Sequence, residues 1–299
     1  MRPFFEHYRA LGVPAESIHV ILNTTDAASP ALAEAQRFLQ DAGAAAPHLW
    51  VAPYTSETMW AERRRVQRAV CSPGDWVLNA DVDELQRYPD TLGAVASFCE
   101  LTGRNVVQGF LIDRLAEGGR LNAYTEGDDL ADAYPVRAEV ALSLIGRGEN
   151  HGIGATVKMM MHRGDVFPKR GGHNPKFERS ALRYLAGAPL SHLPQAANPV
   201  SRFRFPFQVD HYKWRDTRRQ SYERRIDTPG VSAAGKEVGG KFLDYLGEHG
   251  ALRLDDISVA APSDQPAGNW RAQMLRLMTK NALQKWVASG SGKLARGQS

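Results

Sequence analysis

Three carboxylates follow directly on an apolar segment in the sequence WVLNADVDELQRYP, whose residues 76–80 are predicted to form a strand. They belong to Asp81, Asp83 and Glu84. Asp81 and Asp83 are two positions apart, so in extended backbone both point to the same side and converge on one hard cation. Mg²⁺ or Mn²⁺ held by so few carboxylates keeps coordination positions open for phosphate oxygens. The motif therefore predicts a divalent-metal site with Asp83 and Asp81 as ligands, and an acidic cluster of purely structural use is the alternative.

The elements that must position this motif alternate between strands and helices. Strands are predicted for residues 18–22, 48–52 and 76–80, whose starts lie 30 and 28 residues apart, with helices between them. This spacing is typical of β-helix-β crossovers, which produce a parallel sheet covered by helices on both faces. In open parallel sheets, ligands bind beyond the carboxyl ends of the strands, which is where the acidic motif falls. The predicted fold class is therefore α/β, with a mostly parallel, Rossmann-like sheet.

Further elements are predicted along the rest of the chain. A helix over 90–103 precedes a strand over 105–113, and the glycine pair at 118–119 is predicted to be a turn between strand-like segments. Residues 156–162 alternate as a strand with Lys158 and His162 on one face. One catalytic domain over residues 1–260 and a C-terminal helical extension over 261–299 is the predicted organisation.

A basic helix precedes the acidic motif. Arg64 and Arg68 are four positions apart and share a helix face, so together they can offer bidentate donors to a pyrophosphate. A solvated helix face is the alternative for both arginines. Cationic side chains beside a metal site would be useful for stabilising a departing diphosphate.

Five segments, in this order, resemble the bacterial family-2-like glycosyltransferases: FFEHYRALGV, WVLNADVDE, VVQGFLIDR, VKMMMHRGDVFPKRGGHNP and VDHYKWR. Those proteins carry a DxDE motif and a late HYKW or HFKW element. The match spans roughly residues 3–226. The resemblance implies a GT-A fold, a nucleotide-diphosphate sugar donor, Mn²⁺ or Mg²⁺ as cofactor, and inversion at the anomeric carbon. Members of the family normally begin with a strand before the first of these segments. Either that first strand is missing from the fold here, or the start codon has been assigned too late in the sequence.

The resemblance also implies roles for residues of the acidic and HYKW motifs. Asp83 would bind the metal directly, and Asp81 would contact the donor ribose or the metal. Glu84 would orient the loop or approach the sugar as a catalytic residue. His211 would complete the metal sphere or touch the diphosphate, with the neighbouring Asp210 as an alternative oxygen ligand.

An inverting transfer also needs a base that deprotonates the acceptor hydroxyl. The resemblance places Asp113 near the donor pocket, so Asp113 is the first choice for this base, followed by Asp165 and Glu178. The glycine-rich loop over 171–175 is predicted to bring His173 close to the sugar, although a simple turn is the alternative. Lys158 is also predicted to bind the donor.

The predicted function is the transfer of a sugar from a nucleotide-diphosphate donor to a glycan or lipid-linked acceptor. A nucleotidyltransferase with the same two-carboxylate metal site is the first alternative. The net charge of +4 suggests a nucleic-acid-binding protein as a weaker one. That reading is disfavoured because aromatic residues are not interleaved with the basic runs, so no nucleic-acid partner is expected.

The predicted location is cytoplasmic, because the sequence has no run of 18 apolar residues and its first residues lack a signal-peptide core. In the C-terminal segment, Leu275, Met278, Ala282 and Trp286 mark one helical stripe. Such a helix can rest on the inner face of a membrane, and packing against its own domain is the alternative.

Overall fold

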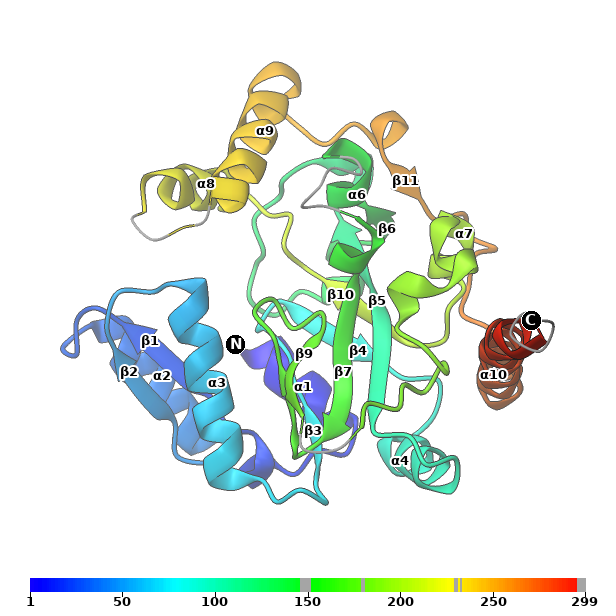
Figure 1. Cartoon of the computed structure of the whole chain (residues 1–299). Coiled ribbons are helices and arrows are strands. Elements are labelled where there is room, and N and C mark those ends of the chain that lie inside the picture. The colour runs from blue at the N-terminus through cyan, green and yellow to red at the C-terminus, as the bar shows by residue number, and fades with distance from the viewer. Residues whose placement is uncertain (146–151, 179–180, 229–230, 232, 295–299) are drawn as a thin grey trace.

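The computed structural model describes the chain except for residues 146–151, 179–180, 229–230, 232 and 295–299 (Figure 1). Its first part contains α1 (Arg2–Ala10), β1 (Ile21–Thr24), α2 (Pro30–Asp41), β2 (His48–Val51) and α3 (Ser56–Val70). The prolines at the start of α1 and α2 suit a first helical turn, where no backbone donor is needed. A capping box between Thr55 and Thr58 begins α3. The helices and strands predicted for this region are confirmed, with shifted ends.

Strands of the main sheet come from the whole length of the remaining chain. They are β3 (Trp76–Leu78), β4 (Glu84–Arg87), β5 (Val106–Leu115), β6 (Val136–Glu139), β7 (Val157–Arg163), β10 (Gln208–His211) and β11 (Ser258–Val259). β5 is the central strand, because it pairs with β7 and β6 as well as with β10. β4 continues the sheet beyond β10, and β3 continues it beyond β7. A separate hairpin joins β8 (Val166–Pro168) to β9 (Pro175–Glu178).

The predicted mostly parallel, Rossmann-like sheet is wrong. In the main sheet β3, β6 and β4 each pair antiparallel with their neighbours, and only β5 and β10 run parallel. β1 and β2 do form the parallel pair that their spacing predicts. Among the described residues, however, no ladder connects that pair to β3. Helix-sized spacing between strands favours a crossover but does not choose the partner strand, so three evenly spaced strands did not become one parallel sheet.

A second difference follows β5. The segment after the glycine pair at 118–119, which is predicted to be strand-like, contains no strand over residues 120–125. Both glycines have positive φ, and a Cβ on Gly119 would lie 1.8 Å from the Leu252 carbonyl oxygen. The turn therefore brings the chain against the segment after α9, instead of returning it along β5 as a hairpin.

Helices cover the sheet and extend to both sides of it (Figure 1). Between the strands lie α4 (Leu92–Leu101), α5 (Leu130–Ala133), α6 (Val140–Leu144) and α7 (Pro199–Phe203). α8 (Arg218–Asp227) and α9 (Ala233–His249) pack on each other through Tyr222 and Phe242, whose rings stack 5.2 Å apart. α10 (Trp270–Leu294) closes the chain. Over the described residues, no helix has the length and hydropathy to cross a membrane.

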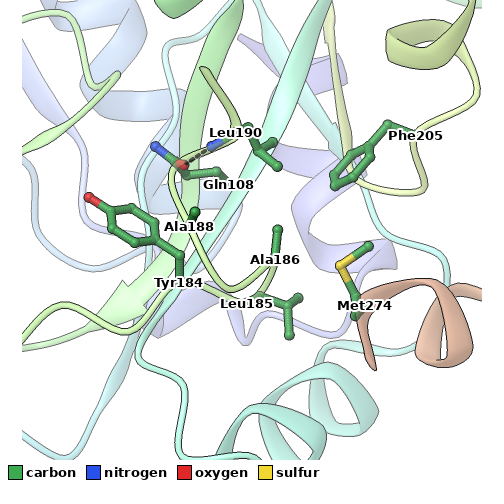
Figure 2. Close-up of a pocket in the computed structure, with 8 residues that line it drawn as sticks. All are labelled: Gln108, Tyr184, Leu185, Ala186, Ala188, Leu190, Phe205 and Met274. Atoms are coloured by element: carbon green, nitrogen blue, oxygen red, sulfur yellow. Dashed lines mark hydrogen bonds between the residues drawn. The ribbon is translucent and has the colours of Figure 1, made fainter. Parts of the chain in front are cut away.

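The largest core cluster lies between the sheet and the helices α4, α7 and α10. It contains Val107, Phe110, Phe207 and Met274, all almost fully buried. A narrow apolar crevice at its edge has no space for a water molecule, and its lining residues are drawn in Figure 2. This crevice is a packing feature of the core, and its lining contains none of the predicted site residues.

Candidate metal and diphosphate site

Strand register brings three of the predicted residues into one row. β10 pairs with β4 on one side, where His211 is opposite Glu84, and with β5 on the other, where His211 is opposite Asp113. The two ladders therefore place residues 84, 113 and 211 side by side although they lie far apart in the sequence. The turn that contains the DVDE motif (residues 81–84), called the DVDE turn below, contacts this row because the Tyr212 amide donates to the Asp83 carbonyl over 2.8 Å.

His211 is held between two carboxylates. Its Nδ1 lies 2.9 Å from Asp113 Oδ1, and its Nε2 lies 3.9 Å from Asp83 Oδ2. When Nδ1 carries the proton and donates to Asp113, Nε2 presents a lone pair towards Asp83. The second oxygen of Asp113 accepts from the Val140 amide over 2.9 Å. Burial raises the pKa of Asp113, but the hydrogen bond from His211, the charges of His211 and Lys213 and the Val140 amide together outweigh burial and keep that pKa below its usual range.

Asp81 lies between two cations, Arg63 and Lys158. Arg63 pairs with Asp81 and donates to Asn79 Oδ1 over 2.9 Å. Lys158 Nζ lies 3.5 Å from the other oxygen of Asp81. Burial raises the pKa of Asp81, yet Arg63 and Lys158 together hold it well below its usual range. The carboxylate is therefore ionised and already neutralised by protein cations.

Lys158 and Glu84 form a buried ion pair beneath the DVDE turn. Their Nζ and Oε1 atoms lie 2.6 Å apart, and both side chains are almost fully buried. Burial lowers the pKa of Lys158, but the charges of Glu84 and Asp81 raise it overall. Glu84 Oε2 also accepts from the Asp81 amide over 3.3 Å. Both residues support the turn from below, and Lys158 donates to the Gly171 carbonyl as well, over 3.0 Å.

The glycine-rich loop packs directly against this network. Gly172 has φ +70°, and a Cβ there would lie 2.8 Å from the Trp60 ring. His173 Nδ1 lies 2.6 Å from the Val157 carbonyl, and burial lowers the pKa of His173 to about 4, so the ring is neutral. Gln108 fastens the loop by donating to the His173 carbonyl over 3.0 Å. Figure 2 shows the other end of Gln108, which accepts from the Leu190 amide.

Three other predicted residues lie away from this network. Arg64 is buried and donates to the Pro168 carbonyl over 3.2 Å, so it connects α3 to β8. Arg68 is exposed and lies over the Phe167 ring at 4.7 Å. Asp210 is buried on the opposite face of β10 from His211, where it pairs with Arg87 and Arg114. The structure does not bring these three side chains together with Asp83.

The two further candidates for the base are placed differently. Asp165 lines an open basin of about 450 Å³ with Arg104, Arg163 and Arg183, next to the residues that precede β3. The acidic motif follows β3, so this basin lies at the other end of that strand. The side chain of Glu178 lies outside the described residues.

Asp83 and His211 fit one open cation site, in the chemistry of their donor atoms. A carboxylate oxygen and a neutral imidazole are both ligands of Mn²⁺, and a histidine ligand usually donates its other ring nitrogen to a carboxylate, as His211 does to Asp113. Over the described ranges, no three histidine, cysteine or acidic side chains gather as a protein-only cage requires. A cation here would take its remaining ligands from water and phosphate oxygens.

Two residues of the site are not among those predicted from the sequence. Arg63 is one: it and Arg64 follow the buried Trp60 by three and four positions, so the sequence alone does not distinguish between them. The Arg63 guanidinium lies 4.6 Å from the centre of that ring. Lys213 is the other. Burial lowers its pKa overall, although the nearby charges of Asp113 and Asp83 raise it. It lies 5.3 Å from the Trp214 ring centre.

The protein thus has a mixed α/β fold, and its candidate site is a carboxylate–histidine pair beside buried cations. No family model and no curated protein matches the chain. Among solved structures, the chain is similar to S. aureus TarS residues 1–349, with 12% sequence identity and a TM-score of 0.30. The similarity covers 81% of this chain and 66% of that one, which is just under two thirds. At this distance the similarity is a weak structural one and indicates no function for this chain.

Proposed function

We propose that the chain is a metal-dependent glycosyltransferase that uses a nucleotide-diphosphate sugar and transfers the sugar, with inversion, to a glycan or lipid-linked acceptor. The observation that carries the proposal is the facing of Asp83 and His211 across 3.9 Å, with His211 oriented by Asp113. Two ligands leave most of a coordination sphere open, which suits a cation shared with a diphosphate. Mn²⁺ or Mg²⁺, when bound, would neutralise charge that develops on the departing diphosphate.

The chain's own residues would prepare this site for an anionic donor. Asp83 and His211 hold the cation, while Asp113 fixes the His211 tautomer and ring orientation. Arg63 and Lys158 keep Asp81 ionised and neutralised, so the DVDE turn does not present three uncompensated carboxylates to a phosphate. Lys213 adds a cation beside the pair, where it can stabilise the leaving group.

The same geometry changes the roles proposed for two carboxylates. Asp113 has both oxygens engaged and is 8% exposed, so it acts on His211 instead of deprotonating an acceptor. Glu84 is 3% exposed beneath the turn and acts as a positioning residue for Asp81. The base that deprotonates the acceptor hydroxyl would then be another residue, on the side of the site that binds the acceptor.

The test is thermal stability of the purified chain with UDP, GDP, CDP and TDP, each with and without Mn²⁺. A ligand that binds only the native state raises the midpoint. We expect one nucleotide to raise it in a metal-dependent way, and Asp83→Ala to remove that shift. Asp255→Ala, which removes an exposed carboxylate elsewhere, should keep it. A shift that persists in Asp83→Ala, or none with any nucleotide, would overturn the assignment.

Products separate the proposal from its nearest alternative. A glycosyltransferase given the matching nucleotide sugar releases the nucleoside diphosphate. In a nucleotidyltransferase the acceptor attacks the α-phosphate instead, which releases a sugar phosphate from a nucleotide sugar or pyrophosphate from a nucleoside triphosphate. Detection of the second set of products would favour the nucleotidyltransferase.

A further inference from the structure

The two halves of α10 have different surroundings. In the first half, Trp270, Met274 and Met278 are buried in the largest core cluster. Asn281 Nδ2 then donates to the Ala186 carbonyl over 2.9 Å. These contacts fix the helix on the body of the protein at the edge of the fold (Figure 1).

The second half carries large apolar side chains on its surface. Leu283, Trp286 and Val287 are 58%, 70% and 50% exposed. They are spaced i, i+3 and i+4, so they share one helix face. Leu275, 48% exposed, continues the same face two turns earlier. A tryptophan exposed to this extent, with aliphatic neighbours on one helix face, is typical of a surface that another apolar phase covers.

The charges on this helix have a single sign. Arg276, Lys280 and Lys285 are all exposed. At about 100° per residue, Lys280 lies next to the apolar face, about 60° from Leu283, and Arg276 lies within about 20° of Leu283, two turns earlier along the helix. Lys285 lies on the far side of the helix. Residues 270–299 contain no aspartate or glutamate at all. Lysine stems on the flanks of an apolar face can extend along it and place their ammonium groups at the level of lipid phosphates.

We propose that the C-terminal half of α10 is a docking surface for an anionic membrane, with Leu283, Trp286 and Val287 inserted at the interface. A lipid surface is the occupant that matches best, because it offers one uniform negative charge next to an apolar layer. A protein partner would offer mixed charges, and nothing on this face is acidic to pair with them. The helix thus lies on the membrane surface and does not span it.

The experiment is flotation of the full-length chain with vesicles of phosphatidylcholine alone and of phosphatidylcholine with about one third phosphatidylglycerol. We expect flotation with the anionic vesicles only, weakened by high salt. Arg276→Gln with Lys280→Gln should weaken binding about thirtyfold, since each basic residue near the surface contributes roughly a factor of five. Leu283→Ser with Trp286→Ser should abolish it. Quenching of tryptophan fluorescence by lipid-borne quenchers should be lost in Trp286→Phe.

Two matched controls remove similar groups elsewhere. Leu101→Ser removes an apolar side chain that is 87% exposed at the end of α4, and Lys241→Gln removes an exposed lysine of α9. Both should leave flotation unchanged. Equal binding by all variants, or none to anionic vesicles, would overturn the proposal. So would concentration-dependent dimerisation that Trp286→Ser removes, because the face would then belong to a second copy. None of these outcomes depends on the nucleotide result.

Discussion

Lys158→Met should strongly destabilise the protein, because among the described residues Lys158 is the only cation within ion-pair distance of Glu84. Glu84 is 3% exposed, so its carboxylate cannot regain water when Nζ, now 2.6 Å away, is lost. Removing one partner of a buried pair typically costs about 3–5 kcal/mol of unfolding free energy. Asp81 keeps Arg63, so we expect a cost of about 3 kcal/mol at pH 7.5, near the low end of that range.

The assay is urea unfolding followed by far-ultraviolet circular dichroism and by tryptophan fluorescence, whose transitions must coincide for a two-state treatment. Combining Lys158→Met with Glu84→Gln should recover much of the loss, because no unpaired charge remains buried. Arg219→Met breaks the exposed pair with Glu223 and should cost less than about 1 kcal/mol. A comparably small cost for Lys158→Met would refute the reasoning.

Three further outcomes are expected. Burial lowers the pKa of His162 to about 4, below its unfolded value of 6.5, so the stability associated with the neutral ring is fully present above pH 6.5 and is lost as pH falls towards 4. His162→Leu should therefore reduce by about 3 kcal/mol the decrease in unfolding free energy on acidification, measured by urea unfolding. Gly172→Ala should lower the unfolding free energy by about 2 kcal/mol, because φ is +70° and the Cβ meets Trp60, whereas Gly74→Ala, with open space around it, should not. Arg63→Gln should weaken the metal-dependent nucleotide shift, whereas Arg68→Gln, which loses only its stacking on Phe167, should leave it intact; equal effects of the two would contradict the placement of Arg63 beside Asp81.

Local patterns in the sequence predicted individual elements well and their pairing poorly. α4 and β7 lie within one or two residues of the predicted ranges, because capping residues and hydrophobic periodicity act over a few positions. The sheet is a different matter. β10 inserts between β4 and β5 through contacts that are about a hundred residues apart in the chain, and no local signal specifies that register.

The candidate site shows the same division. Asp83 and His211 were predicted as ligands from motifs, and the metal itself remains a prediction. That Asp113 orients His211 could not be derived from spacing, because it depends on the β5–β10 register. Arg64 and Arg68 were chosen because they are four positions apart and share a helix face. That spacing does not show which arginine contacts Asp81, because the contact of Arg63 depends on how α3 packs beside the acidic motif.

The most direct test of the central claim is electron paramagnetic resonance of Mn²⁺ added to the protein with pyrophosphate, in the wild type and in Asp83→Asn and His211→Gln. We expect the wild type to bind Mn²⁺ with a nitrogen coupling from imidazole. Asp83→Asn should bind Mn²⁺ much more weakly, and His211→Gln should lose the nitrogen coupling. Mn²⁺ binding that is the same in all three proteins would contradict the central claim.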